Sequence, residues 1–304
     1  MLTRSAQTNH RRLALVSRLP LVISLLLVPL SGCAWYKKGP VVGNVIASRE
    51  LSLSGMEAIQ RGQVEQAEIL FARAVESNPT DARAHCQFAD ALWQRGSADK
   101  AIRHMSQAVE YSGGDPLLLV QQGEMFLQLG ELTRAGKNAD RAIAANRQLA
   151  SAWALKGDVL RARQQLDDAL ASYHRALHHQ EHFPRAQLAA ARIYHMTGKP
   201  MRTLTTLELL VDQYRPGTEP QEVLYLHGLA LKDTGRYSEA IEQLAAANER
   251  GRPSADILYH LADAQFRVGD RVNAKLSVQA ALNLNPVHRN SQALLTRLSA
   301  VAKH

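Results

Sequence analysis

The sequence predicts an all-α protein, a solenoid of seven helix–turn–helix repeats that is closed by one further helix. Three observations support this fold. Small residues recur with a period of 34 residues, each period carries two apolar stretches with helical spacing, and no strand-like alternation is sustained anywhere. The periods start at residues 48, 82, 116, 150, 184, 221 and 255, and only the step between Gly217 and Gln221 is out of register, by three residues.

Three columns of small residues define the periods. The eighth position holds Gly55, Ala89, Gly123, Gly157, Ala191, Gly228 and Ala262. The twentieth holds Ala67, Ala101, Ala135, Ala169, Thr203, Ala240 and Ala274, and the twenty-seventh holds Ala74, Ala108, Ala142, Ala176, Leu210, Ala247 and Ala281. Because one repeat cannot bury its apolar face alone, we expect these positions where the helices of one pair touch each other and the next pair.

A glycine separates the two helices in six of the seven periods. These glycines are Gly62, Gly96, Gly130, Gly198, Gly235 and Gly269. Glycine ends a helix at little cost because it adopts positive φ readily. The fourth period has Gln164 at this place, so the turn signal is absent there.

These residues together resemble the tetratricopeptide repeat. The fourth period matches that family most closely, through Trp153, Gly157, Leu160, Ala169, Tyr173 and Ala176. Pro79 and Pro286 stand where the family often ends a repeat. The resemblance covers residues 48–288 and implies a right-handed α-solenoid. It identifies a fold rather than a function.

The end of such an array needs a cover, and residues 289–304 predict a capping helix. Ala293, Leu294, Leu298 and Val301 are expected on the face that packs against the last repeat. Arg297 and Lys303 are expected on the outer face, in contact with water.

The beginning of the chain predicts an export signal at residues 1–32, followed by a linker at 33–47. A basic start without acids precedes an apolar run that is too short to span a bilayer comfortably. Leu30 to Cys33 then resembles the bacterial lipobox, in which the cysteine receives lipid. We therefore expect an exported lipoprotein anchored through Cys33. Because Ala34 rather than an aspartate follows, the resemblance favours the periplasmic side of the outer membrane. The alternatives are an ordinary signal peptide and an uncleaved anchor.

The net charge and the cysteine content argue against a nucleic-acid partner and against a reactive thiol. The whole chain carries a net charge of +8, and four arginines with no acid lie before Cys33, which leaves 8 − 4 = +4 afterwards. No basic run of useful length occurs in the repeats, so nucleic acid is not an expected partner. If Cys33 carries lipid, Cys86 is alone, and it is expected to be a buried, unreactive side chain.

In the family, the first helix of each pair lines the concave surface, chiefly through positions 2, 5, 9, 12 and 13. The resemblance thus implies a protein-binding face made of Asp90, Trp93, Glu124, Asp158, Arg161, Arg192, Tyr225, Lys232, Tyr259, Asp263 and Phe266. The acids Asp90, Glu124 and Asp158 stand at the same position in successive repeats. Beside Trp93, this row suits a basic segment with apolar anchors. The alternative is that these acids are paired within the solenoid, as Asp158 with Arg161, or simply solvated.

One histidine cluster raises the question of a metal. His174, His178 and His182 are spaced by four, so one helix face could present three imidazoles. Their place on the second helix of a repeat favours a solvated convex face, and we expect no metal and no other cofactor. Repeat spacing accounts for the polar residues otherwise, so no catalytic constellation is expected and the protein is not predicted to be an enzyme.

The leading hypothesis is therefore a lipid-anchored scaffold of the bacterial envelope that holds a protein segment and assists assembly of a larger complex. Two other hypotheses stay open. One is a carbohydrate- or peptidoglycan-binding module that stacks sugars on Trp93, Tyr225 and Tyr259. The other is a regulatory subunit of an envelope enzyme.

Overall fold

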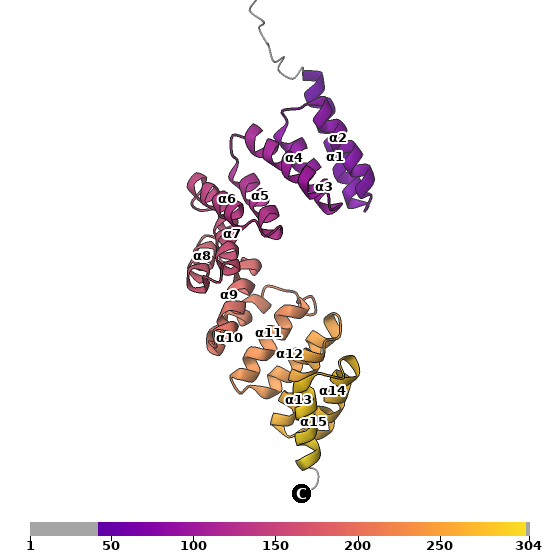
Figure 1. The fold of residues 1–304 in the computed structure, drawn as a ribbon, viewed down its shortest axis with the longest axis vertical. Helices are drawn as coiled ribbons and strands as arrows, with labels where there is room; N and C mark the ends of the chain where they lie inside the picture. Colours follow the sequence, from indigo (N-terminus) through magenta and orange to yellow (C-terminus); the bar gives the residue numbers. More distant parts are fainter. Residues whose placement is uncertain (1–41, 302–304) are drawn as a thin grey trace, which may run out of the picture. The chain divides into compact units, whose positions relative to one another are not determined.

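The structure of the protein is a computed structural model that describes residues 42–301 (Figure 1). The expected signal peptide, Cys33 and Lys303 lie outside the described residues, as does the side chain of Val301.

Residues 42–301 form fifteen α-helices and contain no strand, as the sequence predicts. Seven consecutive helix pairs are followed by a single last helix. The helices are α1 Val42–Gln60, α2 Val64–Ser77, α3 Ala82–Gln94, α4 Ala98–Tyr111, α5 Pro116–Gln128, α6 Leu132–Ala145, α7 Ala150–Ala162, α8 Leu166–His179, α9 Pro184–Met196, α10 Pro200–Val211, α11 Gln221–Asp233, α12 Tyr237–Arg250, α13 Ala255–Val268, α14 Arg271–Leu284 and α15 Arg289–Val301.

Each helix packs against the next one along the chain, and Figure 1 shows this succession of pairs. Odd-numbered helices also contact one another, as α1 with α3, α5 with α7, α7 with α9, α9 with α11, α11 with α13 and α13 with α15. The first helices of the repeats thus lie side by side, and we call the surface that they share the odd-helix face. The expected fold, seven helix–turn–helix repeats with a capping helix, is confirmed.

The columns of small residues lie where the helices touch. Every alanine of the three columns is fully buried, and so are Thr203 and Leu210. A Cβ added at Gly157 would come within 2.6 Å of the Tyr173 ring, and one at Gly228 within 2.6 Å of Leu244. Contacts this short do not occur between real side chains, so these positions require glycine because the paired helix is too close.

The turns between paired helices share one backbone conformation. The six turn glycines all have positive φ, between 65° at Gly198 and 90° at Gly269. Gln164 adopts the same conformation with φ 63°, the one non-glycine residue to do so in the described part of the chain. The fourth turn is therefore built like the others, although its sequence lacks the signal.

The first helix begins earlier than the sequence suggested. Residues 42–47, expected to belong to the linker, form the first turns of α1. Ser48 is fully buried, and its hydroxyl donates a hydrogen bond to Asp81 Oδ2 at 3.3 Å. A helix that began at Ser48 would leave the backbone N–H of this buried residue without a helical partner. The preceding turns remove that cost.

The capping helix packs through Leu294, Leu298 and the buried Ser291. Ala293 is exposed, contrary to expectation, because it is one residue and thus about 100° around the helix from Leu294. Arg297 is exposed as expected, and its guanidinium lies over the Phe266 ring with Cζ 5.1 Å from the centroid. None of the helices in residues 42–301 combines the length and apolar character needed to cross a membrane.

Candidate protein-binding face

The eleven residues expected to bind a partner all lie on odd-numbered helices, which places them on the odd-helix face. Asp90 and Trp93 are on α3, Glu124 on α5, Asp158 and Arg161 on α7, Arg192 on α9, Tyr225 and Lys232 on α11, and Tyr259, Asp263 and Phe266 on α13. Their contacts divide them into a middle, a C-terminal and an N-terminal group. The three groups differ in how many of their charges and hydrogen-bonding atoms find partners within the chain.

In the middle group, one arginine neutralises two of the three acids of the expected row. Arg185, in the first turn of α9, reaches back to Glu124 on α5 and to Asp158 on α7, with Nη2 2.5 Å from Asp158 Oδ2. The Tyr173 hydroxyl donates a 2.7 Å hydrogen bond to the other oxygen of Asp158, which is buried. Burial opposes the charge of Arg185, but Asp158 and Glu124 outweigh it and raise the pKa of the guanidinium.

The pairing of Asp158 differs from the one that the sequence suggested. Arg161 was the example given for the alternative that these acids are paired within the solenoid, but the carboxylate is held by Tyr173 and Arg185. Arg161 lies near Tyr173, and its buried Nε has no hydrogen-bond partner within the described residues. Arg185 occupies position 2 of its repeat, which is one of the positions expected to line the concave surface. The repeat frame could therefore have indicated Arg185 as a residue of this face.

In the C-terminal group, a half-buried lysine joins two helices. Lys232 Nζ on α11 donates to His260 Nδ1 at 3.0 Å and to Asp263 Oδ2 at 3.2 Å, both on α13. His260 Nδ1 accepts this bond, so the imidazole is neutral. Burial, followed by the charge of Lys232, lowers the pKa of His260 to about 4. Tyr225 and Tyr259 pack against the same ring, with centroids 6.0 and 4.8 Å away.

Most other expected binding residues are also engaged by the chain. Arg192 makes a two-point contact with Glu222, with Nε 2.5 Å from Oε1. The Trp93 indole is half-buried, and its Nε1 donates to Gln128 Oε1 at 3.2 Å. Tyr225 and Tyr259 pack at a tilt against His260, so contacts within the chain already engage these aromatic rings.

The N-terminal group is different, because it lines an open groove between α1 and α3. Two adjoining pockets of about 350 and 260 Å³ share Met56 and Gln87. Leu53 and Met56 line them with exposed fractions of 56% and 45%. Asp90 lies in the wall of the larger pocket. We call this the N-terminal groove and define it by Leu53, Met56, Gln87 and Asp90.

Two polar groups of the N-terminal groove lack strong partners. Among the described residues, Asp90 forms no ion pair, and its one hydrogen-bond contact is the Cys86 thiol at 3.9 Å. Burial raises the pKa of Asp90. The Oε1 atom of Gln87 is buried without a hydrogen-bond partner in this part of the chain. The sequence pattern pointed to Asp90 but not to Leu53 or Gln87, which lie at position 6 of their repeats, outside the positions taken to line the groove.

Cys86 and the histidines have structural contacts. The Cys86 thiol is half-buried and donates to Gln121 Oε1 at 3.3 Å, and burial, assisted by Asp90, raises its pKa to about 12. The thiol therefore stays protonated and unreactive at neutral pH. His174 Nε2 lies 2.8 Å from the Tyr194 hydroxyl, His178 packs against His179, and His182 follows the end of α8. Within residues 42–301, no three His, Cys, Asp or Glu side chains are grouped to hold a metal ion.

Solved structures with the same architecture cover most of the chain. A tetratricopeptide repeat protein from Parabacteroides merdae ATCC 43184 is 15% identical, with a TM-score of 0.56, over 84% of this chain and 99% of its own. PilW, described as a widely conserved type IV pilus biogenesis factor, is 20% identical with a TM-score of 0.59, over 66% of this chain and 92% of its own. YrrB, described as a TPR protein with an unusual peptide-binding site, is 20% identical with a TM-score of 0.55, over 62% and 96%.

None of the curated protein sequences matches the chain. The family model for the tetratricopeptide repeat, in contrast, matches residues 53–116, 86–152, 154–200 and 225–286. These matches span well over half of the 304 residues and follow the repeat frame that the helix pairs display. The chain therefore belongs to the tetratricopeptide repeat family.

Proposed function

We propose that the protein is a non-enzymatic scaffold that binds a segment of a partner protein in the N-terminal groove. The observation that carries this proposal is the contrast among equivalent acids. Glu124 and Asp158 are neutralised by Arg185, and Asp263 is neutralised by Lys232, whereas Asp90 has no ion-pair partner in the described chain. A carboxylate left in a half-buried groove is stabilised when a partner supplies a donor.

The groove also defines the chemistry of the segment. Leu53 and Met56 offer apolar surface to one side chain, which would gain about 25 cal/mol for each Å² of apolar area that it buries. A lysine, an arginine or a backbone N–H in the segment can donate to Asp90, and an N–H can satisfy Gln87 Oε1. An apolar anchor flanked by a donor is the kind of contact in which interface energy concentrates.

The structural relatives support this role. The structure of YrrB is described as having a peptide-binding site, and PilW is described as a pilus biogenesis factor. We extend the proposal on this basis: the protein is anchored in the outer membrane through lipid on Cys33, and it assists assembly of an envelope complex. Leu30-Ser31-Gly32-Cys33 supports the anchor, because small residues stand before a cysteine at the end of an apolar run.

A photo-crosslinking amino acid at Met56 tests the binding site in the native cells. We expect one protein to be captured from Met56 and lost when Asp90→Asn is added. Met201, an equally apolar side chain exposed on α10, is the matched control position and should not capture that protein. Capture of the same protein from both positions, or capture from Met56 that ignores Asp90→Asn, contradicts the proposal.

The anchor is tested separately with Cys33→Ser. The substituted protein should lose fatty-acid labelling and move from the membrane fraction to the soluble fraction, while its repeats stay folded by circular dichroism. Continued membrane association together with an unlabelled wild-type chain would show that Cys33 is not lipidated. That result would leave the groove proposal intact, because the groove does not depend on the anchor.

A further inference from the structure

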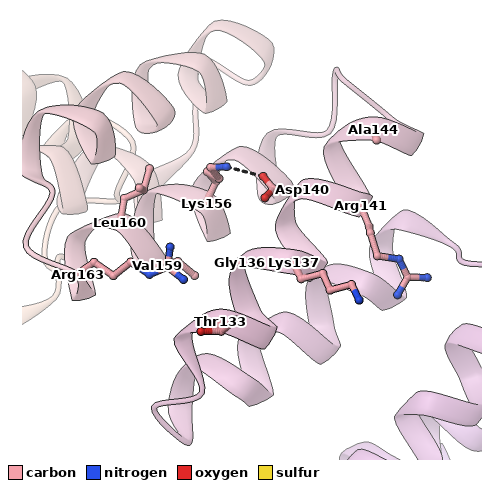
Figure 2. Close-up of a pocket in the computed structure, with 10 residues that line it drawn as sticks. All are labelled: Thr133, Gly136, Lys137, Asp140, Arg141, Ala144, Lys156, Val159, Leu160 and Arg163. Atoms are coloured by element: carbon pink, nitrogen blue, oxygen red, sulfur yellow. Dashed lines mark hydrogen bonds and ion pairs between the residues drawn. The ribbon is translucent and has the colours of Figure 1, made fainter.

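We propose that a second groove, between α6 and α7, binds an acidic segment of a partner protein. This groove has a volume of about 490 Å³ and is lined by Lys137 and Arg141 from α6, by Lys156 from α7 and by Arg163, which directly follows α7 (Figure 2). One carboxylate, Asp140, lies among these four cations. The site differs from the N-terminal groove in its helices and in the sign of its charge.

The cations of this basic groove are largely unneutralised. Lys156 contacts Asp140, which Figure 2 marks with a dashed line. Lys137, Arg141 and Arg163 form no ion pair within residues 42–301. Arg163 Nη2 donates to the backbone oxygen of Leu132 at 3.1 Å, which holds its guanidinium beside α6. Lys137 and Arg141 are one turn apart and extend in the same direction in Figure 2. Four cationic residues and one carboxylate therefore line the groove, with the Lys137 and Arg141 side chains extending away from α7 in Figure 2, and carboxylates complement this excess of positive charge.

Gly136 gives an independent reason to expect an occupant. It lies inside α6, where glycine is less favourable than alanine by about 1 kcal/mol. The four glycines at the eighth position of the repeats are explained by packing, because a Cβ there would lie under 3.0 Å from a neighbouring side chain. A Cβ at Gly136 would meet Val159 Cγ1 at 3.5 Å and Arg163 Nη2 at 3.6 Å, which are ordinary contacts. Packing within the described residues therefore does not require this glycine, and its missing side chain leaves the backbone of α6 open to close approach from the groove.

The lining of the basic groove favours a protein segment over a free anion. Val159, Leu160 and Ala144 add apolar surface between the cations. Asp140, Lys156 and Leu160 also line an adjoining pocket that extends to Trp153 and Arg175, whose guanidinium lies 4.7 Å from the centre of the indole ring. The two adjoining pockets carry more cationic than acidic residues, with Asp140 and Asp168 as the acids, and they also offer apolar surface, which suits an extended chain with acidic and apolar side chains.

The test uses the full chain and a short fluorescent peptide rich in glutamate and leucine, followed by anisotropy. Matched peptides with glutamine or lysine in place of glutamate measure the dependence on charge. The glutamate peptide should bind, more tightly at low salt than at high salt. Lys137→Glu with Arg141→Glu should weaken that binding about tenfold, since two attractions become repulsions. Gly136→Leu should weaken it by filling the groove while helicity is unchanged.

The control reverses Arg271 and Lys275 to glutamate. These exposed residues are also one turn apart on an even-numbered helix, and they form no ion pair within the described chain. This variant should bind the glutamate peptide like the wild type. Equal weakening by both reversals, or equal binding of the glutamate and glutamine peptides, overturns the proposal. Binding of vesicles of anionic phospholipid or of an RNA oligonucleotide that depends on Lys137 and Arg141, without peptide binding, would assign the groove to that ligand instead.

Discussion

The two ends of the odd-helix face have the same repeat frame, but their polar side chains differ in whether the chain itself provides them with partners. At the C-terminal end, the half-buried Lys232 and His260 and the buried Asp263 form a hydrogen-bonded network, and α15 covers the last repeat. At the N-terminal end, α1 is the first helix of the described residues, and the groove beside it leaves Asp90 and apolar side chains open. Equivalent frame positions therefore do not have equivalent chemistry. What distinguishes them is whether a neighbouring repeat supplies the partner.

The strongest test of this contrast is the same substitution at both ends. Asp263→Asn should lower the free energy of unfolding by about 2–3 kcal/mol, because it leaves the charge of Lys232 buried without a counter-charge. The side chains of Lys232 and Asp263 are only 14% and 11% exposed. Asp90→Asn should change stability by less than about 0.5 kcal/mol, since no ion pair in the described chain is lost. Urea denaturation of both variants measures the difference, and equal losses would remove the distinction between the two ends.

Acid should destabilise the C-terminal network next most strongly. Burial and Lys232 hold the pKa of His260 at about 4 in the folded protein, below its usual 6.5. The unfolded state therefore binds more protons between these pH values, so stability is complete above about pH 6.5 and falls as the pH decreases toward 4. The free energy of unfolding that is lost through protonation of His260 should reach about 2 kcal/mol at pH 5.

The charged and titratable groups that act on His260 are Lys232, Asp263, Asp256 and His195. His260→Gln should flatten the dependence of the melting temperature on pH, while His178→Gln, at an exposed position on α8, should leave it unchanged. His104 and His227 have pKa values lowered by burial and contribute in the same direction. An identical slope in His260→Gln and wild type would show that this histidine does not cause the acid sensitivity.

Removing Arg185 should make the middle of the face resemble its N-terminal end. Arg185→Met should cost about 1–2 kcal/mol, reduced by the partial exposure of the pair with Glu124. Asp158 keeps its bond from Tyr173, so the helices should stay folded. A short lysine-rich peptide should then bind more tightly to the variant than to the wild type. Unchanged affinity at unchanged stability would show that Arg185 does not neutralise the row in solution.

The smallest expected change in the free energy of unfolding comes from a substitution in the turn at Gln164. Gln164→Gly should raise the free energy of unfolding by about 0.5–1 kcal/mol, because a non-glycine residue pays for φ 63° and glycine does not. Gly130→Gln, at the equivalent turn of the preceding repeat, should lower stability by a similar amount. A loss of stability in Gln164→Gly would mean that the glutamine side chain contributes more than its backbone conformation costs.

The repeat frame predicted only part of the binding face. The frame placed Asp90, Glu124 and Asp158 on equivalent helices, as the structure has them. It could not show that Arg185 would reach back across two repeats, because the length of an arginine allows several partners at this distance. Nor could it show that Gln87 Oε1 would lie buried without a partner, since burial depends on how closely α1 and α3 pack.

The sequence by itself determined the repeat, the helix pairs, the turns and the packing columns, because each rests on local size or backbone freedom repeated at a fixed period. Only the tertiary structure decided the early start of α1, the exposure of Ala293 and the conformation of Gln164. It also decided which charges are satisfied within the chain and which face a groove. Charge pairing joins long, flexible side chains from different repeats, so it depends on distances between helices, whereas repeat periodicity records only position along one chain.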